Sequence, residues 1–390
     1  MKILIGCCWP PELGQGISTV SRDIATALAK HGHDVHYLSP PSCFSDWYRD
    51  NGIHNVSIGP EVSAAAGLSL VREYHAAVCP DLTLNNDHPY LQAAFPLLTG
   101  TKAVICHTLN WATFELAITN HEHIDHIFAL SVDMWERLVR KGVNPAKIKI
   151  VQNGIHDPVN ANQLFDQTSD RPNLRAVFAG SWTRVKGADL LIRAIKNAPP
   201  DLEWLTVDCF GDGRLLGEAT KIDRSWLKVH GRVPREQFLS VLRESDVLLF
   251  PSRTEGCPMT IIEAQAYGVI PIASNGRGAM REMVTHGLDG FLVRLSDFDT
   301  DMWNILTALK NQPDYLSMIK RNARDTFLTR FTIERQIDHI LAIAAYGGHR
   351  QSGHAGPARP ICWHRPSQLS KKIPRLRARV AYRLGIILRG

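Results

Sequence analysis

Short apolar runs alternate with amphipathic stretches over the first 150 residues of the chain. The first run is followed by a loop rich in proline and glycine and then by a helical pattern from Ser18 to about His31. The next run completes a β-loop-α-β unit. The strands expected in this part of the chain are residues 2–6, 34–38, 82–84, 103–105, 127–130 and 148–151. Strands and helices that alternate in this way predict a parallel sheet.

The same alternation begins again after a polar segment. Residues 153–173 are rich in Asn, Asp, Gln, Ser and Pro, a composition typical of a linker. Residues 300–346 at the other end read as mostly helix, with breaks at Pro313 and Thr332. The strands expected between these segments are residues 174–179, 205–210, 227–230, 247–250, 269–272 and 291–293. A second doubly wound domain is therefore predicted.

The predicted fold class is α/β, with two doubly wound, Rossmann-like domains and a basic C-terminal tail. Parallel sheets of this kind are covered by helices on both faces. The organisation that we expect is an N-terminal domain over 1–155, a linker over 156–173, a second domain over 174–330, a C-terminal helix over 331–346 and a tail over 347–390.

Length and composition agree with a globular protein of two domains. The chain has 390 residues, of which 44% are hydrophobic and 21% charged, and these values exclude wholesale disorder and fibrous repeats. No run of 18 apolar residues is present, and the N-terminus lacks the pattern of a secretory signal. The eight cysteines show neither zinc-ligand nor disulfide spacing. We therefore expect a cytoplasmic protein with reduced cysteines.

The net charge of +6 is carried by the C-terminal tail. Residues 350–390 contain ten Lys or Arg and no Asp or Glu, which leaves 34 basic against 38 acidic side chains elsewhere, a net charge of −4. Within residues 371–389, apolar side chains fall on one stripe of a helix and arginines flank it. This pattern predicts a helix on an anionic membrane surface. A disordered solubilising tail and a nucleic-acid patch are the alternatives, and we favour the membrane.

Loops at the carboxyl ends of parallel strands are where ligands bind in such sheets. Residues 10–18 place glycines before a helix N-terminus, where backbone N–H groups attract anions. Residues 180–187 place Arg184 and Lys186 before another helix, where positive charge suits a departing diphosphate. Taken singly, the first loop is as typical of a tight turn, and the second is more typical of a solvated basic turn.

A pair of glutamates carries the strongest local signal. Glu255 lies in a glycine-containing loop, and Glu263, with seven residues between the two, lies inside a helix expected to begin near Pro258. We expect loop and helix start to face the same cleft, with one carboxylate suited to sugar hydroxyls and the other to ribose hydroxyls. A lone helical glutamate is normally solvated. Because apolar residues surround Glu263, a specific partner is the better interpretation.

Seven motifs occur in order along residues 1–346. They are the proline and glycine loop, Gly32-His33-Asp-Val35, Val151-Gln-Asn-Gly-Ile155, Lys186-Gly187, Gly211-Asp-Gly213, Gly231-Arg-Val233, and Phe250-Pro-Ser252 with the two glutamates. Their joint order is highly specific. In these ordered motifs the chain resembles glycosyltransferase family four, the glycosyl transferases of group 1. The resemblance implies the GT-B architecture, in which two Rossmann-like domains face a central cleft, and a retaining sugar transfer.

The functional residues of the family correspond to five positions of this sequence. Gly16 matches the second glycine of an N-terminal pair, whose backbone N–H faces the donor diphosphate. His107, directly after an expected strand, matches a histidine beside the donor sugar that contributes to activity. Lys186 matches the lysine on the diphosphate. Glu255 matches the glutamate that contacts the donor sugar, and Glu263 matches the one that holds the ribose. Read without the resemblance, His107 is more often structural, since seventeen histidines are present.

Two positions depart from the family pattern. Gln15 replaces the first glycine of the pair, and Gly14 stands one position earlier. Ser181 stands where the family usually has an arginine directly after the glycine of the second loop. Arg184, three residues further on in the same loop, is the candidate substitute for this missing phosphate ligand.

The resemblance implies a transfer from a nucleotide-diphosphate sugar to a glycan or lipid-linked acceptor, as in polysaccharide, lipopolysaccharide or glycolipid biosynthesis. Neither a DxD-like carboxylate pair nor His/Cys ligand spacing appears. We therefore expect no cofactor and no metal, with Lys186, Gly16 and helix N-termini stabilising the diphosphate. No nucleic-acid partner is expected. Donor-sugar choice is expected to depend on Glu255, Gly256, Cys257, Pro258 and Met259.

Two other functions fit parts of this pattern. A sugar-nucleotide epimerase of the same fold shares the diphosphate site and needs no acceptor. A catalytically degenerate partner subunit is consistent with Gln15 and Ser181. Retention of both glutamates, Lys186 and His107 argues against the second alternative, because a dead site has no physical need for them.

Overall fold

The computed structural model describes residues 1–13, 16–108, 111–159 and 173–347. Contacts divide the chain into two compact units. Of the described residues, the first unit contains those of Met1–Asn153 and the chain from Gln336 to Gly347, and the second contains those of Gly154–Arg335. Each unit has its own parallel sheet and its own hydrophobic core.

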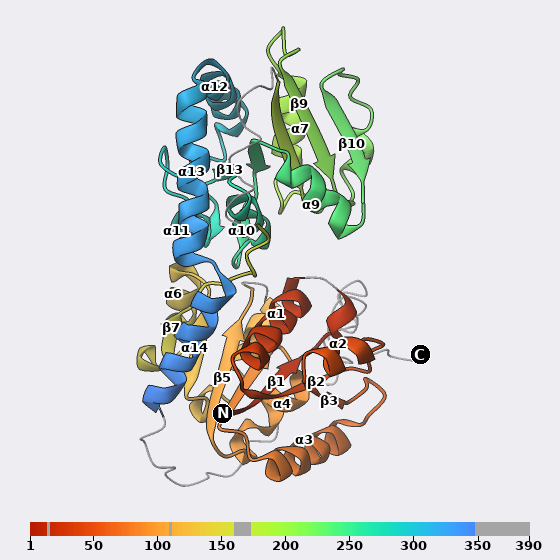
Figure 1. Ribbon diagram of the computed structural model, residues 1–390, viewed down its shortest axis with the longest axis vertical. Helices are drawn as coiled ribbons and strands as arrows, with labels where there is room; N and C mark the ends of the chain where they lie inside the picture. The colour runs from red at the N-terminus through yellow and green to blue at the C-terminus, as the bar shows by residue number, and fades with distance from the viewer. Residues whose placement is uncertain (14–15, 109–110, 160–172, 348–390) are drawn as a thin grey trace. The chain divides into compact units, whose positions relative to one another are not determined.

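In the described part of the first unit, seven parallel strands form a sheet in the order β3-β2-β1-β4-β5-β6-β7 (Figure 1). The strands are β1 (Lys2–Cys7), β2 (Asp34–Ser39), β3 (His54–Ser57), β4 (Leu82–Asn86), β5 (Thr101–Cys106), β6 (His126–Ala129) and β7 (Ile148–Ile150). The helices between them are α1 (Gly16–Lys30), α2 (Ser45–Asp50), α3 (Ala64–Val78), α4 (Pro89–Ala94), α5 (Trp111–Ile118) and α6 (Val132–Arg140). The strand order reverses between β1 and β4, and doubly wound sheets bind their ligands at such a point.

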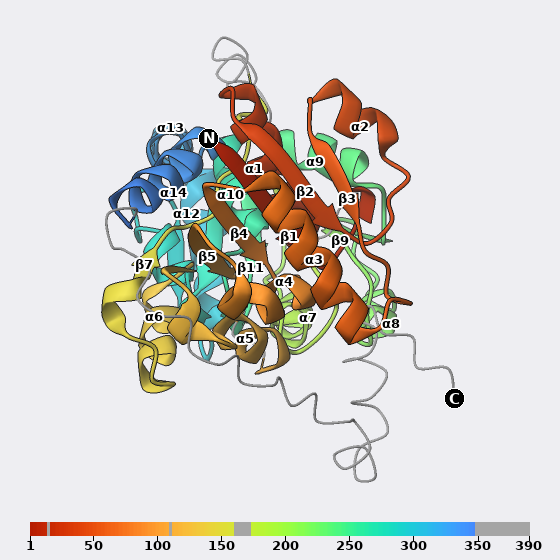
Figure 2. The ribbon, with the colours of Figure 1, turned by 90° about the horizontal axis from the view of Figure 1, so that it is seen from below.

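Burial explains why the inner strands were predictable and the edge strand was not. Figure 2 shows β5, β4, β1, β2 and β3 following one another across the sheet. Ile3, Leu4 and Ile5 of β1 are at most 1% exposed, as expected for a strand covered on both faces. Strand β3, His54–Ser57, has no apolar run and is mostly exposed at the edge. Its pairing with β2 comes from tertiary structure, so the sequence pattern did not predict it.

In the described part of the second unit, six parallel strands form a sheet in the order β10-β9-β8-β11-β13-β15, and β12 and β14 form a separate pair. The strands are β8 (Leu174–Ala179), β9 (Leu205–Phe210), β10 (Leu227–Gly231), β11 (Val247–Phe250), β12 (Thr254–Glu255), β13 (Ile270–Ser274), β14 (Arg277–Gly278) and β15 (Phe291–Val293). The helices are α7 (Ala188–Lys196), α8 (Leu216–Ala219), α9 (Arg235–Arg243), α10 (Met259–Ala266), α11 (Met280–Met283), α12 (Phe298–Asn311) and α13 (Pro313–Arg330). Here the strand order reverses between β8 and β11.

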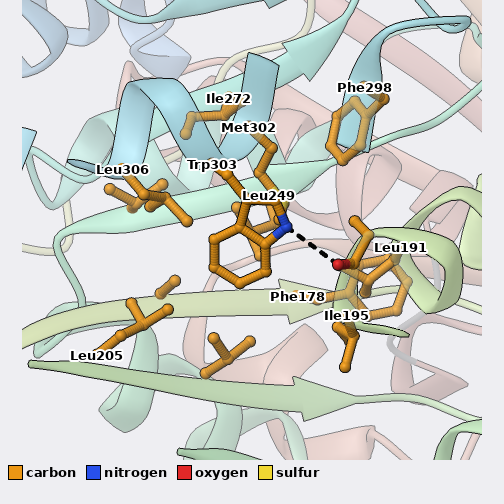
Figure 3. Packing of buried hydrophobic residues seen from close by; sticks show 14 of the residues in the cluster. Phe178, Leu191, Ile195, Leu205, Leu249, Ile272, Phe298, Met302, Trp303 and Leu306 are labelled. Carbon is orange, nitrogen blue, oxygen red and sulfur yellow. Dashed lines mark hydrogen bonds between the residues drawn. The ribbon is translucent and has the colours of Figure 1, made fainter. Parts of the chain in front are cut away.

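The core of the second unit joins its sheet to helices far apart in sequence. Figure 3 shows Trp303 of α12 among buried residues that include Phe178 of β8 and Leu249 of β11. The Trp303 indole Nε1 donates a hydrogen bond of 3.0 Å to the Ala194 carbonyl of α7. A buried tryptophan whose N–H has a partner adds apolar contact without an unsatisfied donor. This packing holds α7 and α12 together on one face of the sheet.

The fold class is confirmed, but the division of the chain differs from the expected one. The first unit ends at Asn153, where we expected a domain to 155, and the second extends to Arg335, where we expected 330. The C-terminal helix, expected at 331–346, is α14 (Ile333–Gly347), and from Gln336 it belongs to the first unit. Sequence patterns identify a helix, but they do not show which core it completes.

Two predicted segments lie largely outside the described residues. Most of the expected linker over 156–173 falls in 160–172, and nearly all of the expected tail over 347–390 falls in 348–390. The predicted membrane-surface helix at 371–389 lies there entirely. Among the described residues, no helix combines the length and the apolar composition needed to cross a bilayer.

Candidate functional site

Two loops meet at the switch point of the second unit. One loop follows β8 and leads into α7, and the other follows β11. Gly187 has a positive φ of 69°, and a Cβ added to it would lie 1.9 Å from the Pro251 carbonyl oxygen. Only glycine fits this backbone conformation and this close approach. The predicted Lys186-Gly187 motif is thus pressed against the start of the loop that carries Glu255.

Lys186 and Glu255 form an ion pair across these two loops. The Lys186 ammonium donates to Glu255 Oε1 at 2.7 Å and to Oε2 at 2.8 Å. Ser252 Oγ donates to the same carboxylate at 2.6 Å. The Glu255 side chain is 10% exposed and that of Lys186 34% exposed. Two residues 69 positions apart in sequence, both predicted to contact the donor, are therefore in direct contact.

Arg253 fixes the geometry of the two loops, and sequence analysis did not single it out. Its guanidinium donates to Asp189 Oδ1 at 2.7 Å and to Oδ2 at 2.9 Å, and it also donates to the Arg184 carbonyl oxygen. Asp189 lies in the first turn of α7. The Arg253 guanidinium beside it holds the pKa of that carboxyl below its usual range, although burial opposes the shift. A planar bidentate contact of this kind is more directional than a lysine pair.

Arg184 stays an untested candidate for the phosphate site. Its side chain is exposed on the loop, as is that of Ser181. Its guanidinium makes no hydrogen bond to another residue in the described ranges, whereas Lys186 is held by Glu255. The structure thus brings Lys186 and Glu255 together and leaves Arg184 outside that contact.

Glu263 is almost completely buried on α10, with 3% of its surface exposed. The helix begins at Met259, with Pro258 as the residue before it, as the sequence predicted. Arg235, the first residue of α9, donates to Glu263 Oε1 at 2.5 Å. A buried carboxylate requires such a partner. Arg235 was missed because its position near Glu263 depends on tertiary packing.

The segment between the two glutamates is partly buried. Cys257 and Pro258 are buried, whereas Gly256 and Met259 are half-buried. The Cys257 sulfur lies 3.9 Å from the Met283 sulfur. Cys257 therefore packs into the protein interior, and Gly256 and Met259 are the more accessible of the predicted specificity residues.

In the first unit, Gly16 begins α1 and has an exposed backbone. Its φ is +30°, and in the described part of the chain no atom beyond its chain neighbours and its own helix lies within 4 Å of the position that a Cβ would take. Residues 14 and 15 lie outside the described ranges, so the altered glycine pair itself is not described. The accessible N-terminus of a 15-residue helix has the N–H groups and the positive dipole end that bind an anion.

His107 follows β5 and contacts the end of the neighbouring strand β4. Its Nε2 lies 2.7 Å from Asn86 Oδ1, so Nε2 donates and Nδ1 is available as an acceptor. Burial lowers the pKa of His107 to about 3. The side chain is therefore a neutral imidazole at physiological pH. It can accept a hydrogen bond from a ligand through Nδ1, but it does not supply positive charge.

Possible metal ligands are grouped elsewhere. Among the described residues, the group of three His, Cys, Asp or Glu side chains close enough to share an ion is Asp34, His36 and His54. None of the predicted site residues belongs to it. All three lie on β2 and β3 of the first unit.

Two family descriptions match adjacent parts of the chain. Glycosyltransferase Family 4 matches residues 14–157, and Glycosyl transferases group 1 matches residues 160–326. Together these two segments include every residue discussed above as a donor-site candidate. The resemblance inferred from the ordered motifs is thereby confirmed.

Individual relatives agree with these matches. An uncharacterized glycosyltransferase of Haemophilus influenzae is 35% identical over 322 residues, which cover 78% of this chain and 89% of that protein. A UDP-Gal:alpha-D-GlcNAc-diphosphoundecaprenol alpha-1,3-galactosyltransferase of Escherichia coli is 28% identical over 216 residues, which cover 51% of this chain and 54% of that protein. The chain spans about half the length of the first curated relatives it matches.

A solved structure shows the same fold. Alr3699/HepE of Anabaena, crystallised in complex with UDP-glucose, has a TM-score of 0.69 and 18% identity, covering 89% of this chain and 100% of that chain. At this identity the likeness is one of fold alone. It confirms the GT-B architecture, with two parallel α/β domains, that the ordered motifs implied.

Proposed function

We propose that this chain, which belongs to the group 1 glycosyl transferases of glycosyltransferase family 4, is a retaining enzyme that takes its sugar from a nucleotide-diphosphate donor. The acceptor in this proposal is a glycan or a lipid-linked saccharide. The observation that carries the proposal is the Lys186 and Glu255 pair at the switch point of the second sheet. A cation and a carboxylate held together there suit a ligand that is anionic at one end and rich in hydroxyl groups at the other.

Lys186 would bind the diphosphate while it stays paired with Glu255. An ammonium group has three N–H donors, and the two oxygens of Glu255 accept two of them. The third is available to a phosphate oxygen. As the bond to the sugar breaks, negative charge grows on the diphosphate, so a fixed cation lowers the barrier. Gly16 at the N-terminus of α1 would supply backbone N–H groups for the same purpose.

Glu255 would accept hydrogen bonds from hydroxyl groups of the donor sugar. Ser252 and Lys186 already orient this carboxylate, so it loses little side-chain freedom when the sugar binds. Glu263 would hold the ribose, with the Arg235 guanidinium paired to the buried carboxylate and orienting it. His107, neutral and oriented by Asn86, would accept a hydrogen bond beside the reacting sugar through Nδ1.

The proposed mechanism needs no metal, because Lys186 and a helix N-terminus provide the positive ends for the diphosphate. Retention of the anomeric configuration belongs to the same proposal, and the resemblance to the family supports it. In it, the acceptor attacks the anomeric carbon on the face from which the diphosphate leaves. The Escherichia coli relative, named for a UDP-Gal donor and a diphosphoundecaprenol-linked acceptor, supports a nucleotide-sugar donor and a lipid-linked acceptor in this proposal. The Anabaena structure of the same fold, which holds UDP-glucose, agrees with such a donor.

We also propose that the tail at residues 371–389 brings the enzyme to an anionic membrane surface, where lipid-linked acceptors are found. Apolar and arginine positions in this segment support the proposal. The full chain should sediment with anionic vesicles, less so at high salt, and a chain ending at Gly348 should not. Equal sedimentation of both chains, or of neither, would contradict it.

Donor turnover by the purified chain tests the proposed reaction. The chain is incubated with a panel of nucleotide-diphosphate sugars, with and without lipid-linked or lipopolysaccharide-type acceptors. Proton NMR then reads the anomeric configuration of the product. A retained configuration and an acceptor-dependent product are expected. Inversion would refute retention. Isomerised donor in the absence of acceptor would indicate the epimerase alternative. Complete inactivity of well-folded protein would indicate the degenerate partner subunit.

A further inference from the structure

Three potential metal ligands lie at one edge of the first unit's sheet. Asp34 and His36 are two residues apart on β2, so their side chains point to the same face. His54 on β3 is the register partner of His36. Asp34 and His54 are the first residues of their strands. The group therefore lies at the amino ends of the strands, whereas His107 follows the carboxyl end of β5.

The donor atoms of these side chains are close to the spacing that a small metal ion requires. Asp34 Oδ1 lies 3.1 Å from His54 Nε2 and 3.5 Å from His36 Nε2. All three donor atoms lie within 4.8 Å of one another. Ligands about 2.0–2.1 Å from a tetrahedral zinc ion are about 3.3 Å from each other. The two contacts of Asp34 already match this value, and the exposed His54 side chain has room to turn toward the same point.

His36 is held in the orientation that a metal ligand needs. Its second ring nitrogen, Nδ1, lies 2.7 Å from the Tyr74 hydroxyl of α3. Metal-binding histidines characteristically use their other nitrogen in a hydrogen bond of this kind, which fixes the ring. The His36 side chain is 10% exposed, whereas those of Asp34 and His54 are more open to solvent. An ion can reach the group from solvent and complete its coordination with water.

Neighbouring groups compete with a metal ion for these ligand atoms. Lys2 of β1 is the register partner of Asp34, and its ammonium donates to the Val78 carbonyl at 3.3 Å. The rings of His36 and His54 stack with 4.5 Å between their centroids. Two stacked imidazoles and one carboxylate do not need a metal, since the carboxylate can bond to both rings. Two features favour a metal site over a surface ion pair without a metal. The Tyr74 hydroxyl is hydrogen-bonded to His36 Nδ1, and the Nε2 atoms of both histidines lie near the same oxygen of Asp34.

We propose that Asp34, His36 and His54 bind one divalent transition-metal ion of the zinc type. Two imidazoles and a carboxylate with an open position are a ligand set that zinc accepts. The ion would connect the edge strand β3 to β2, and so stabilise a strand that has few buried apolar residues of its own. Since the group lies at the opposite ends of the strands from His107, this role is independent of the proposed sugar transfer.

Zinc binding to the intact, metal-stripped chain tests the proposal by calorimetry and thermal unfolding. The chain has 17 histidines and 8 cysteines, so the result rests on differences between variants. His54→Ala and Asp34→Asn change exposed side chains. Each should reduce the number of bound zinc ions by one or lower the zinc affinity of this site at least about tenfold. Tyr74→Phe should leave the number of bound zinc ions unchanged and lower the affinity of this site about tenfold. His123→Ala, a partly exposed histidine outside the group, should bind zinc as the wild type does.

The structural role has its own measurement. Zinc should raise the unfolding temperature of the wild type and slow amide exchange in residues 54–57, and it should do neither in His54→Ala. If the wild type and His54→Ala bind the same number of zinc ions with the same affinity, the proposal is wrong. An equal loss in His123→Ala would also overturn it, because binding would then be nonspecific. Sugar transfer plays no part in these readouts, so their failure leaves the proposed function untouched.

Discussion

Replacement of Lys186 by methionine should separate binding of the diphosphate from binding of the nucleoside. Methionine keeps most of the length and the apolar stem and removes the charge. The lost contact is a charge-assisted hydrogen bond to a phosphate oxygen, worth about 1.5–3 kcal/mol. At 1.4 kcal/mol per factor of ten, the Kd for a nucleoside diphosphate should rise about 10- to 150-fold. The Kd for the nucleoside should not change.

Protein stability should fall as well, because the Glu255 side chain is only 10% exposed and loses its cation. Leaving a mostly buried carboxylate without one of its partners costs about 1–3 kcal/mol. Glu255 keeps its hydrogen bond from Ser252. Lys196 is exposed in the last turn of α7, the helix that follows Lys186, and it offers a matched control. Lys196→Met should leave the affinities for nucleoside diphosphate and nucleoside unchanged.

Isothermal titration with UDP and uridine provides the assay, and GDP and ADP with their nucleosides extend it if UDP does not bind. Equal weakening of nucleotide and nucleoside would refute the phosphate role of Lys186 and indicate a general disturbance of the loop. Unchanged affinity for both would show that the ammonium serves only to hold Glu255.

Three further outcomes follow from the structure. Glu263→Ala should weaken nucleotide binding about 10- to 150-fold, because a hydrogen bond from the ribose to a charged group is lost. Titration with UDP measures this, and an unchanged affinity would exclude the ribose role. Transfer should continue in excess EDTA at a temperature where the chain stays folded, and a complete loss restored by Mg²⁺ or Mn²⁺ would contradict the cationic site. His88 caps α4, and burial lowers its pKa to about 3 in the folded chain, against about 6.5 in the unfolded chain. As the pH decreases from about 6.5 toward 3, the unfolded chain takes up a proton that the folded chain does not, so the free energy of unfolding falls. At pH 5 this costs about 2 kcal/mol, and His88→Asn, which keeps a capping side chain, should lose less stability between pH 7 and pH 5 in thermal unfolding.

Much of the fold was predictable because buried parallel strands are continuous apolar runs. Lys2–Cys7 and Val247–Phe250 show this pattern directly. The donor-site candidates come from a different signal, the ordered motifs of glycine and charged side chains in the loops after these strands, and their roles remain predictions. Gly187 illustrates it, because the approach of the Pro251 carbonyl excludes any side chain there.

What could not be predicted depends on contacts between distant segments. Arg235 and Arg253 are two among many arginines until the fold places them against Glu263 and Asp189. The edge strand at His54 has no apolar period, so its register against His36 could not be read from the sequence. That register creates the proposed zinc ligand set, although sequence analysis found no ligand spacing.

The return of α14 to the first unit has a consequence for synthesis of the protein. Residues 1–153 leave the ribosome first, but α14 supplies Ile337 and Ile340, both fully buried, only after the whole second unit has been made. At about 5–20 residues per second, the nascent first unit waits about 10–40 s for its last helix. Through that interval the apolar surface that α14 later covers stays open to solvent, and exposed surface of this kind favours aggregation of a nascent chain.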